Sequence, residues 1–379
     1  MARRLQELLD AKEGGLGPEL LERLPTPWRF TGSAARDYEL SDEALVAALQ
    51  AAMLLGQPLI LAGEPGVGKT TLAAALAHRL ELYFHDPVQV KSTASGLDLF
   101  YAFDEVARFR DASSPAPAAA AAAGKSGATK GLKDYVRLTS LGRAILWSAG
   151  PDALVTLGSV PAEEILGRPG RETVLRLGDL FPNAFRYEEE DGAGGFVERR
   201  VDSSRRSVAL IDELDKAPKD APNDVLAELE TMSFRIRELD LTVAARHSAW
   251  PILLVTSNSE RSLPDAFLRR CVFHWIEFPT PERLYAIVAM RCGRNYGLEP
   301  GDTLLTSAVS VFISLRDKVE NKKPATAELI SFLVALREFG FQRGDTVDPE
   351  DPRVVQLFGT MMKTFVDLQV AAPAPAQGE

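Results

Sequence analysis

The chain has 379 residues, a net charge of -10 and two cysteines, Cys271 and Cys292. A chain of this length can bury about 75% of its unfolded surface, so one large or two medium domains fold without a disulfide or a metal staple. The negative charge argues against a constitutive nucleic-acid binder, which must attract phosphates. We expect a cytoplasmic protein, because residues 1–15 lack the apolar core of a signal peptide and Pro58 interrupts the one stretch that imitates a membrane span.

The first predicted elements are a helix over residues 41–55, capped by Ser41, and an apolar strand over residues 58–62. A glycine-rich segment follows, and then a helix over residues 70–80. In such a loop the glycines let backbone amides face phosphates, Lys69 reaches the β- and γ-phosphates, and Thr70 offers a hydroxyl to Mg²⁺. A plain glycine-rich turn would lack this strand-to-helix context. The predicted ATP-binding residues are Gly63, Glu64, Pro65, Gly66, Val67, Gly68, Lys69, Thr70 and Thr71.

Further apolar strands are predicted over residues 208–211, 251–256 and 272–276, with a weaker one over residues 88–91. Their continuous apolar character is typical of parallel strands that are buried on both faces. The pattern predicts an α/β fold: a P-loop three-layer αβα core with a parallel sheet of about five strands, followed by a smaller all-α lid domain. The predicted divisions are an N-terminal segment (1–36), the core (37–279), the helical domain (280–370) and a disordered tail (371–379).

A long insertion separates the phosphate loop from the next strong strand, at about residues 92–206. Within it, the Pro- and Ala-rich stretch 112–131 predicts a mobile loop, and residues 185–200 predict a hairpin around an Asp191-Gly192 turn. After residue 281 the pattern becomes helical, with helices expected over 282–295, 302–319, 325–339 and 352–370. The sequence indicates no role for the insertion.

Two acids follow the strand over residues 208–211. Asp212 is the candidate for holding Mg²⁺, and Glu213 is the candidate for orienting and polarising the attacking water. Two solvent-exposed acids with no catalytic role could also follow a strand in this way, but the phosphate loop upstream favours the catalytic interpretation. The pair therefore predicts hydrolysis of ATP.

Two later segments supply further candidates. Asn258 follows the strand over residues 251–256 and is expected near the γ-phosphate, although an asparagine that merely forms a turn is the alternative. Arg269 and Arg270 precede the last strand, where one of them can reach the γ-phosphate of a neighbouring subunit. A solvated pair of arginines is the alternative.

These motifs, their order and the helical domain resemble an AAA+ ATPase of the MoxR family over about residues 37–370. Residues 208–230 and 263–271 carry the most family-specific similarity. The resemblance implies a hexameric ring, with Arg270 matching the finger arginine by motif position. It also implies that ATP and Mg²⁺ drive the remodelling, activation or metal loading of a client protein, with a von Willebrand factor A domain protein as the candidate client.

Two details of the resemblance concern other segments. Residues 232–243 resemble a hairpin inserted in this branch of AAA+ proteins, with an expected role in client contact. The arginine that often follows a proline in the helical domain is missing after Pro324, and Lys322 or Lys323 is a possible replacement, as is a merely solvated pair of lysines.

Two alternative functions remain open at this point. One is a nucleotide-controlled assembly switch in a signalling or defence system, in which hydrolysis only resets the assembly. The other is a nucleic-acid motor, which depends on the predicted hairpin and on an arginine cluster, Arg199, Arg200, Arg205 and Arg206. The cluster also fits the solvated end of a hairpin.

Overall fold

The computed structural model describes residues 42–113, 130–190, 195–258 and 261–371. Their contacts divide these residues into two units, each described here by itself. The α/β unit contains residues up to Gly63 and residues Lys69–Ile276, and the helical unit contains Glu277 onward. The middle of the phosphate loop, Glu64–Gly68, falls with the helical unit. Nothing in the sequence pattern predicted this assignment.

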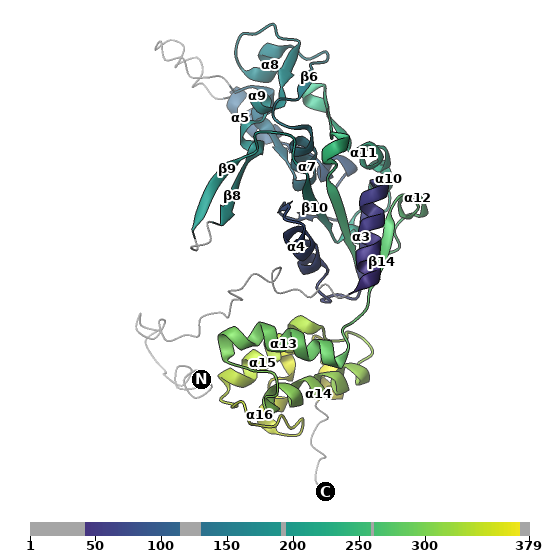
Figure 1. The fold of residues 1–379 in the computed structure, drawn as a ribbon, viewed down its shortest axis with the longest axis vertical. Helices are drawn as coiled ribbons and strands as arrows, with labels where there is room; N and C mark the ends of the chain where they lie inside the picture. Colours follow the sequence, from purple (N-terminus) through teal and green to yellow (C-terminus); the bar gives the residue numbers. More distant parts are fainter. Residues whose placement is uncertain (1–41, 114–129, 191–194, 259–260, 372–379) are drawn as a thin grey trace. The chain divides into compact units, whose positions relative to one another are not determined.

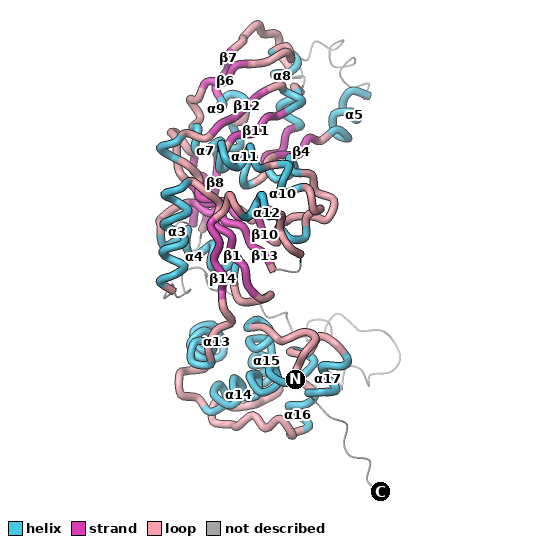
Figure 2. Tube along the Cα trace, turned by 90° about the vertical axis from the view of Figure 1, so that its right-hand side faces the viewer, coloured by secondary structure: helices cyan, strands magenta, loops and turns pink. Residues whose placement is uncertain are grey.

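A parallel sheet forms the centre of the α/β unit (Figure 2). Its strands are β1 (Leu59–Gly63), β2 (Tyr83–Phe84), β3 (Val88–Gln89), β10 (Ser207–Asp212), β13 (Ile252–Ser257) and β14 (Val272–Ile276). The order is β14-β1-β13-β10-β2, and β3 also pairs with β10. The predicted α/β class with a parallel sheet and a helical C-terminal part is confirmed. The sheet has six strands rather than about five, because β2 is only two residues long and leaves no periodic pattern.

Alternate residues of the central strands enter two different cores, which makes the unit three-layered. Leu59 and Leu61 of β1 pack with helices α3 (Glu43–Leu55) and α4 (Lys69–Arg79). Ile60 and Ala62 pack on the opposite face, where the core includes helix α7 (Ser140–Ala149). Helix α3 is capped by Asp42, whose carboxylate accepts two backbone N–H bonds. The predicted cap, Ser41, lies outside the described residues.

Most of the insertion that the structure describes is folded. Its elements are β4 (Tyr101–Phe103), α5 (Glu105–Ser113), β5 (Val136–Leu138), β6 (Leu154–Thr156), α8 (Ala162–Leu166), β7 (Val174–Arg176) and α9 (Leu177–Leu180). Phe100, Trp147 and Phe185 are fully buried in the same core as the sheet. Residues 114–129, most of the predicted mobile loop, lie outside the described residues.

The predicted hairpin of the insertion is confirmed as strands β8 (Arg186–Glu190) and β9 (Phe196–Arg200). Figure 1 shows these strands extending away from the rest of the α/β unit. Residues 191–194, which include the expected Asp191-Gly192 turn, lie outside the described residues.

A second hairpin, β11 (Ser233–Ile236) with β12 (Leu241–Ala244), matches the one expected over residues 232–243. Its apolar side chains are buried, and its turn is tied to the insertion, since Asp240 accepts a bond from the backbone N–H of Ser159 at 2.6 Å. Helix α11 (Leu226–Thr231) contacts this hairpin, and α10 (Ala221–Asp224) packs against both α11 and α12 (Asp265–Leu268).

The helical unit packs around one apolar core. Its helices are α13 (Pro281–Tyr296), α14 (Thr303–Lys318), α15 (Thr326–Glu338), α16 (Pro352–Val355) and α17 (Phe365–Ala371). The single helix predicted over residues 352–370 is wrong. That stretch breaks near Gly359, a poor helix former, and restarts where Thr364 bonds the backbone and side chain of Asp367. No helix among the described residues is long and apolar enough to cross a membrane.

Candidate functional site

The phosphate loop begins where the buried strand β1 ends. Gly66 has φ 77° and Gly68 has φ 92°, a backbone region that residues with a Cβ rarely adopt. A Cβ at Gly66 would also lie 2.3 Å from the Cβ of Ala325 in the helical unit. Lys69 is buried and its Nζ donates to the carbonyl oxygen of Gly63 at 2.9 Å. The lysine side chain of the loop therefore bonds back to the residue at which the loop begins.

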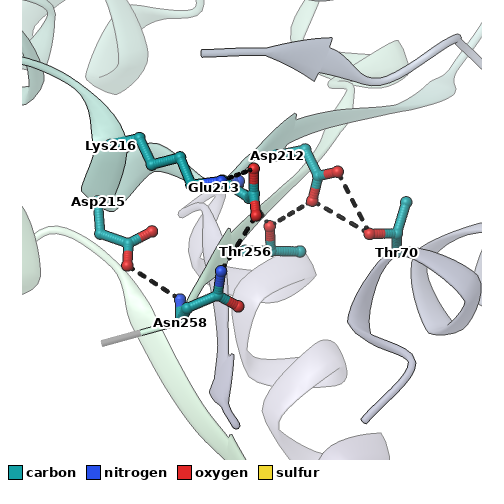
Figure 3. A network of polar contacts seen from close by, with 7 residues as sticks. All are labelled: Thr70, Asp212, Glu213, Asp215, Lys216, Thr256 and Asn258. Carbon is teal, nitrogen blue, oxygen red and sulfur yellow. Dashed lines mark hydrogen bonds and ion pairs between the residues drawn. The ribbon is translucent and has the colours of Figure 1, made fainter. Parts of the chain in front are cut away.

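Asp212 ends β10 as a buried carboxylate, only 8% exposed. The hydroxyl of Thr70 donates to its two oxygens at 3.1 and 3.3 Å, and the hydroxyl of Thr256 donates to Oδ1 at 2.5 Å (Figure 3). Thr256 stands on β13, which lies between β1 and β10 in the sheet. The ends of β10 and β13 and the first turn of α4 therefore meet at Asp212.

Glu213 follows in a left-handed backbone conformation, with φ 57° and ψ 49°. Its N–H donates to the Thr256 hydroxyl at 2.8 Å, so a single threonine fixes both acids. The Glu213 side chain turns away from Asp212, since Asn258 Nδ2 donates to its Oε1 at 3.1 Å and Lys216 Nζ lies 2.6 Å from its Oε2. The Lys216 bond is the main cause of a lowered Glu213 pKa, which burial opposes and Asn258 assists.

The short 3₁₀ turn Leu214–Lys216 also positions Asn258. Asp215 is buried, and its carboxylate accepts the backbone N–H of Asn258 at 3.1 Å. Figure 3 shows Lys216 reaching toward Glu213 and Asp215 reaching toward Asn258 from the same turn. The backbone and the side chain of Asn258 are therefore both held by acids.

The structure brings some predicted residues together and leaves others apart. Thr70, Asp212, Glu213 and Asn258 form one network (Figure 3). Arg270 stands before β14, where its Nε bonds Glu230 and its Nη1 donates to the carbonyl of Ala266 at 2.9 Å. The remaining predicted residues, Glu64, Pro65, Val67 and Thr71, lie in the loop or in the first turn of α4.

Sequence reasoning missed the residues that support the network. A polar Thr256 inside an otherwise apolar strand was the available signal for one of them. Asp215 and Lys216 lay in a stretch recognised only by its resemblance to a family. Their bonds depend on a turn that no periodicity predicts.

Arg316 is a further residue that sequence reasoning missed, and it belongs to the helical unit. It is 8% exposed, its guanidinium stacks 3.5 Å from the ring centroid of Phe278, and it pairs with Glu64 of the phosphate loop. Its Nη1 donates to the carbonyl of Pro324 at 2.5 Å. In contrast, the candidate replacements Lys322 and Lys323 are exposed.

The donor set fits Mg²⁺ and a nucleotide phosphate. Mg²⁺ keeps several waters and takes one or two carboxylates together with substrate phosphates, and Thr70 and Asp212 offer a hydroxyl and a carboxylate that already meet. Among the described residues no group of three or more His, Cys, Asp or Glu side chains is arranged to hold a metal alone. The oxygen-only pair beside a curled glycine loop is therefore consistent with a metal held jointly with phosphate.

Comparison with known proteins gives little beyond this geometry. No protein-family model matches the sequence, and no curated protein does. Among solved structures the chain is similar to the RuvB Holliday junction branch migration motor of Thermotoga maritima, with 16% identity and a TM-score of 0.38, over 84% of this chain and 67% of that one. Two variants of the same RuvB give TM-scores of 0.39 and 0.38 at 16% and 15% identity, over 84% and 83% of this chain and 67% of each of theirs. Scores this low carry no functional inference, so the case for a function rests on the site itself.

Proposed function

We propose that the protein is a Mg²⁺-dependent ATPase of the AAA+ type. The observation that carries the proposal is the separation of two consecutive acids into two environments. Asp212 is bonded by Thr70 of the phosphate loop, whereas Glu213 points toward Asn258. A hydrolase needs one acid for the metal and another for the water, so this division matches the chemistry.

Each residue then has a defined task. Lys69 and the backbone amides of residues 63–70 would hold the β- and γ-phosphates, and Thr70 and Asp212 would hold Mg²⁺, which would neutralise charge on the phosphates. Glu213 accepts a hydrogen bond from the attacking water and orients it. Asn258 fixes Glu213 through the bond from its Nδ2 to Oε1. Catalysis would come from positioning and charge stabilisation.

Arg270 would complete the site of a neighbouring subunit in a homo-oligomeric ring, a hexamer by the MoxR resemblance. It is exposed at the surface, with Glu230 as its partner within the chain. An arginine supplied in trans is worth about 10³ to 10⁵ in rate in other phosphoryl-transfer enzymes. We propose remodelling, activation or metal loading of a client protein as the use of this energy, and a von Willebrand factor A domain protein as a candidate client.

The arginine cluster gives little support to the alternative function of a nucleic-acid motor. Part of the arginine cluster on the hairpin is neutralised across its strands, since Arg199 pairs with Glu189, and the neighbouring Arg186 pairs with Glu198. Arg205 is occupied at the base of the hairpin, where it donates to the hydroxyl of Tyr187 at 2.7 Å. Paired arginines present little net charge to a phosphate backbone.

The test of the proposed activity is ATP turnover by the purified full chain with and without Mg²⁺. We expect phosphate release that EDTA abolishes and excess Mg²⁺ restores. Glu213→Gln should retain ATP binding and lose at least about 10²-fold in kcat, because it removes the group that orients the water. A Glu213→Gln variant that turns over at the wild-type rate would refute the assignment.

The same variant tests the client proposal. Glu213→Gln loaded with ATP should hold a partner that the wild type releases after hydrolysis. Pull-down in ATP, with ADP as the control, would identify that partner. Equal recovery of all proteins in ATP and ADP would remove the client from the proposal.

A further inference from the structure

Lys216 lies in the turn that follows Asp212 and Glu213, and the proposed mechanism assigns it no role. Residues Leu214–Lys216 form one 3₁₀ turn, closed by a bond from the N–H of Lys216 to the carbonyl of Glu213 at 3.0 Å. Glu213 is the left-handed residue that precedes this turn, three positions before Lys216. The closed turn brings the ammonium of Lys216 to 2.6 Å from the carboxylate of Glu213.

The two oxygens of Glu213 are held by different elements. Lys216 contacts Oε2 at 2.6 Å from the turn, and Asn258 donates to Oε1 at 3.1 Å from the end of β13. One donor would leave the carboxylate free to rotate about its terminal bond, whereas two donors at its two oxygens define its plane. Figure 3 shows Glu213 between these two side chains.

We infer that Lys216 is a positioning residue for hydrolysis, which fixes the Glu213 carboxylate in the orientation from which it aligns the attacking water. This inference rests on the proposed ATPase function. Lys216 acts through Glu213, and the bonds that hold Asp212 come from Thr70 and Thr256 instead. Loss of Lys216 should therefore affect the chemical step and leave the phosphate and metal groups in place.

Loss of the ion pair between Lys216 and Glu213 should affect the stability of the fold much less than the rate of hydrolysis. The side chains of Lys216 and Glu213 are 44% and 33% exposed, and ion pairs at such exposure contribute little to folding stability. Catalytic rates respond far more steeply to geometry, since a displacement of about 1 Å can cost about 10²-fold. A fall in kcat without a fall in stability is thus the expected signature.

The experiment compares three variants of the full chain in steady-state ATP hydrolysis. Lys216→Met keeps the length of the side chain without the charge and should lower kcat about tenfold or more, with KM within about twofold of the wild type. Lys216→Arg restores a cationic donor and should recover most of the rate. Lys219→Met removes an exposed lysine three residues further on and should behave as the wild type. Thermal unfolding of each variant checks that all are folded.

The outcomes separate the inference from the function on which it rests. If wild-type turnover does not depend on Glu213, the proposed function fails. If turnover does depend on Glu213 and Lys216→Met has an unchanged or raised kcat, the positioning role is overturned while the ATPase stands. A rise in KM in step with the fall in kcat, or no recovery with Lys216→Arg, also overturns it.

Discussion

Thr256 is the residue on which the arrangement of the two acids depends most directly. It is 1% exposed, its hydroxyl donates to Asp212, and the same oxygen accepts the N–H of Glu213. Removing the hydroxyl leaves a buried carboxylate oxygen and a backbone N–H without this partner, which costs about 1–3 kcal/mol per unsatisfied group.

We therefore predict that Thr256→Val lowers both the free energy of unfolding and kcat, the latter by at least about tenfold. Valine preserves the shape and lacks the hydroxyl. Thr256→Ser, which retains the hydroxyl, is the matched control and should stay near wild-type values. Denaturant unfolding and steady-state hydrolysis measure the two effects, and a valine variant with normal values of both would contradict this role.

His85 is a buried residue whose charge state should make stability depend on pH. Its Nε2 lies 2.9 Å from the hydroxyl of Ser207, and its ring packs against Trp147. Burial, with smaller effects of Arg143 and Arg205, lowers its pKa to about 3. The unfolded chain binds this proton near pH 6.5, so the folded state loses stability as pH falls from about 6.5 toward 3.

We predict that His85→Gln, which retains a hydrogen-bonding group and cannot titrate, reduces this pH dependence. The measurement is the denaturation midpoint of both proteins at pH 7.5 and pH 5.5. The readout is the difference between the two pH values rather than the absolute stability, because glutamine also changes the packing. Equal pH differences for the two proteins would exclude His85 as the cause.

At the scale of elements, the N-terminus of α3 is held by one carboxylate. Asp42 accepts the N–H groups of Ala44 and Leu45 through Oδ1, and its Oδ2 lies 3.1 Å from the Nε2 of His274 on the edge strand β14. We predict that Asp42→Ala lowers the free energy of unfolding by about 0.5–2 kcal/mol.

Asp42→Asn separates the two contributions, since asparagine can still cap the helix and lacks the charge that faces His274. Urea denaturation should therefore place it between the wild type and the alanine variant. If the asparagine and alanine variants lose the same stability, the cap is not the source of the effect.

The sequence predicted those elements that have a regular spacing of apolar residues or are bounded by glycine and turn-forming residues. The long apolar strands, the phosphate loop and the α13, α14 and α15 helices all had such a signal, as did the hairpin of the insertion. Two very short elements, β2 and the turn Leu214–Lys216, had none, because they are fixed by partners far away in the sequence. For the same reason, the position of Asp212 and Glu213 at the end of a strand was predictable from the sequence, whereas the residues that bond them were not.

The C-terminal stretch shows how a local break escapes a periodic pattern. Apolar spacing over residues 352–370 continues across Gly359, yet the structure has two helices there, α16 and α17. The bonds between Thr364 and Asp367 give the backbone an alternative to a continuous helix. Both helices contribute to the same apolar core, which includes Val354 of α16 and Ala371 of α17. Packing in that core therefore stabilises two short helices in place of one long helix.

At the scale of the whole molecule, the ring proposal requires that Arg270 of one subunit serve Glu213 of the next. We predict that Arg270→Ala and Glu213→Gln are each nearly inactive alone, and that mixing the two restores hydrolysis. In mixed rings some interfaces combine the intact Glu213 of the first variant with the intact Arg270 of the second. Turnover after mixing the purified variants is the measurement.

Arg269→Ala is the control that distinguishes the two arginines. It should hydrolyse ATP at close to the wild-type rate if Arg270 is the residue that acts in trans. Recovery of activity by mixing Arg269→Ala instead of Arg270→Ala with Glu213→Gln, after an equal loss alone, would transfer the role to Arg269. Mixed variants that remain as inactive as their parents would remove the ring mechanism.

The left-handed backbone of Glu213 has a consequence for the evolution of this site. A residue with a Cβ in that conformation costs about 1–3 kcal/mol, a penalty that asparagine, which tolerates φ 57° better, would reduce. Selection for thermal stability alone would thus favour the loss of the carboxylate to which we assign the orientation of the attacking water. Descendants that no longer hydrolyse ATP should drift toward asparagine or glycine at position 213, and a glutamate kept there against this pressure is a sign of a working enzyme.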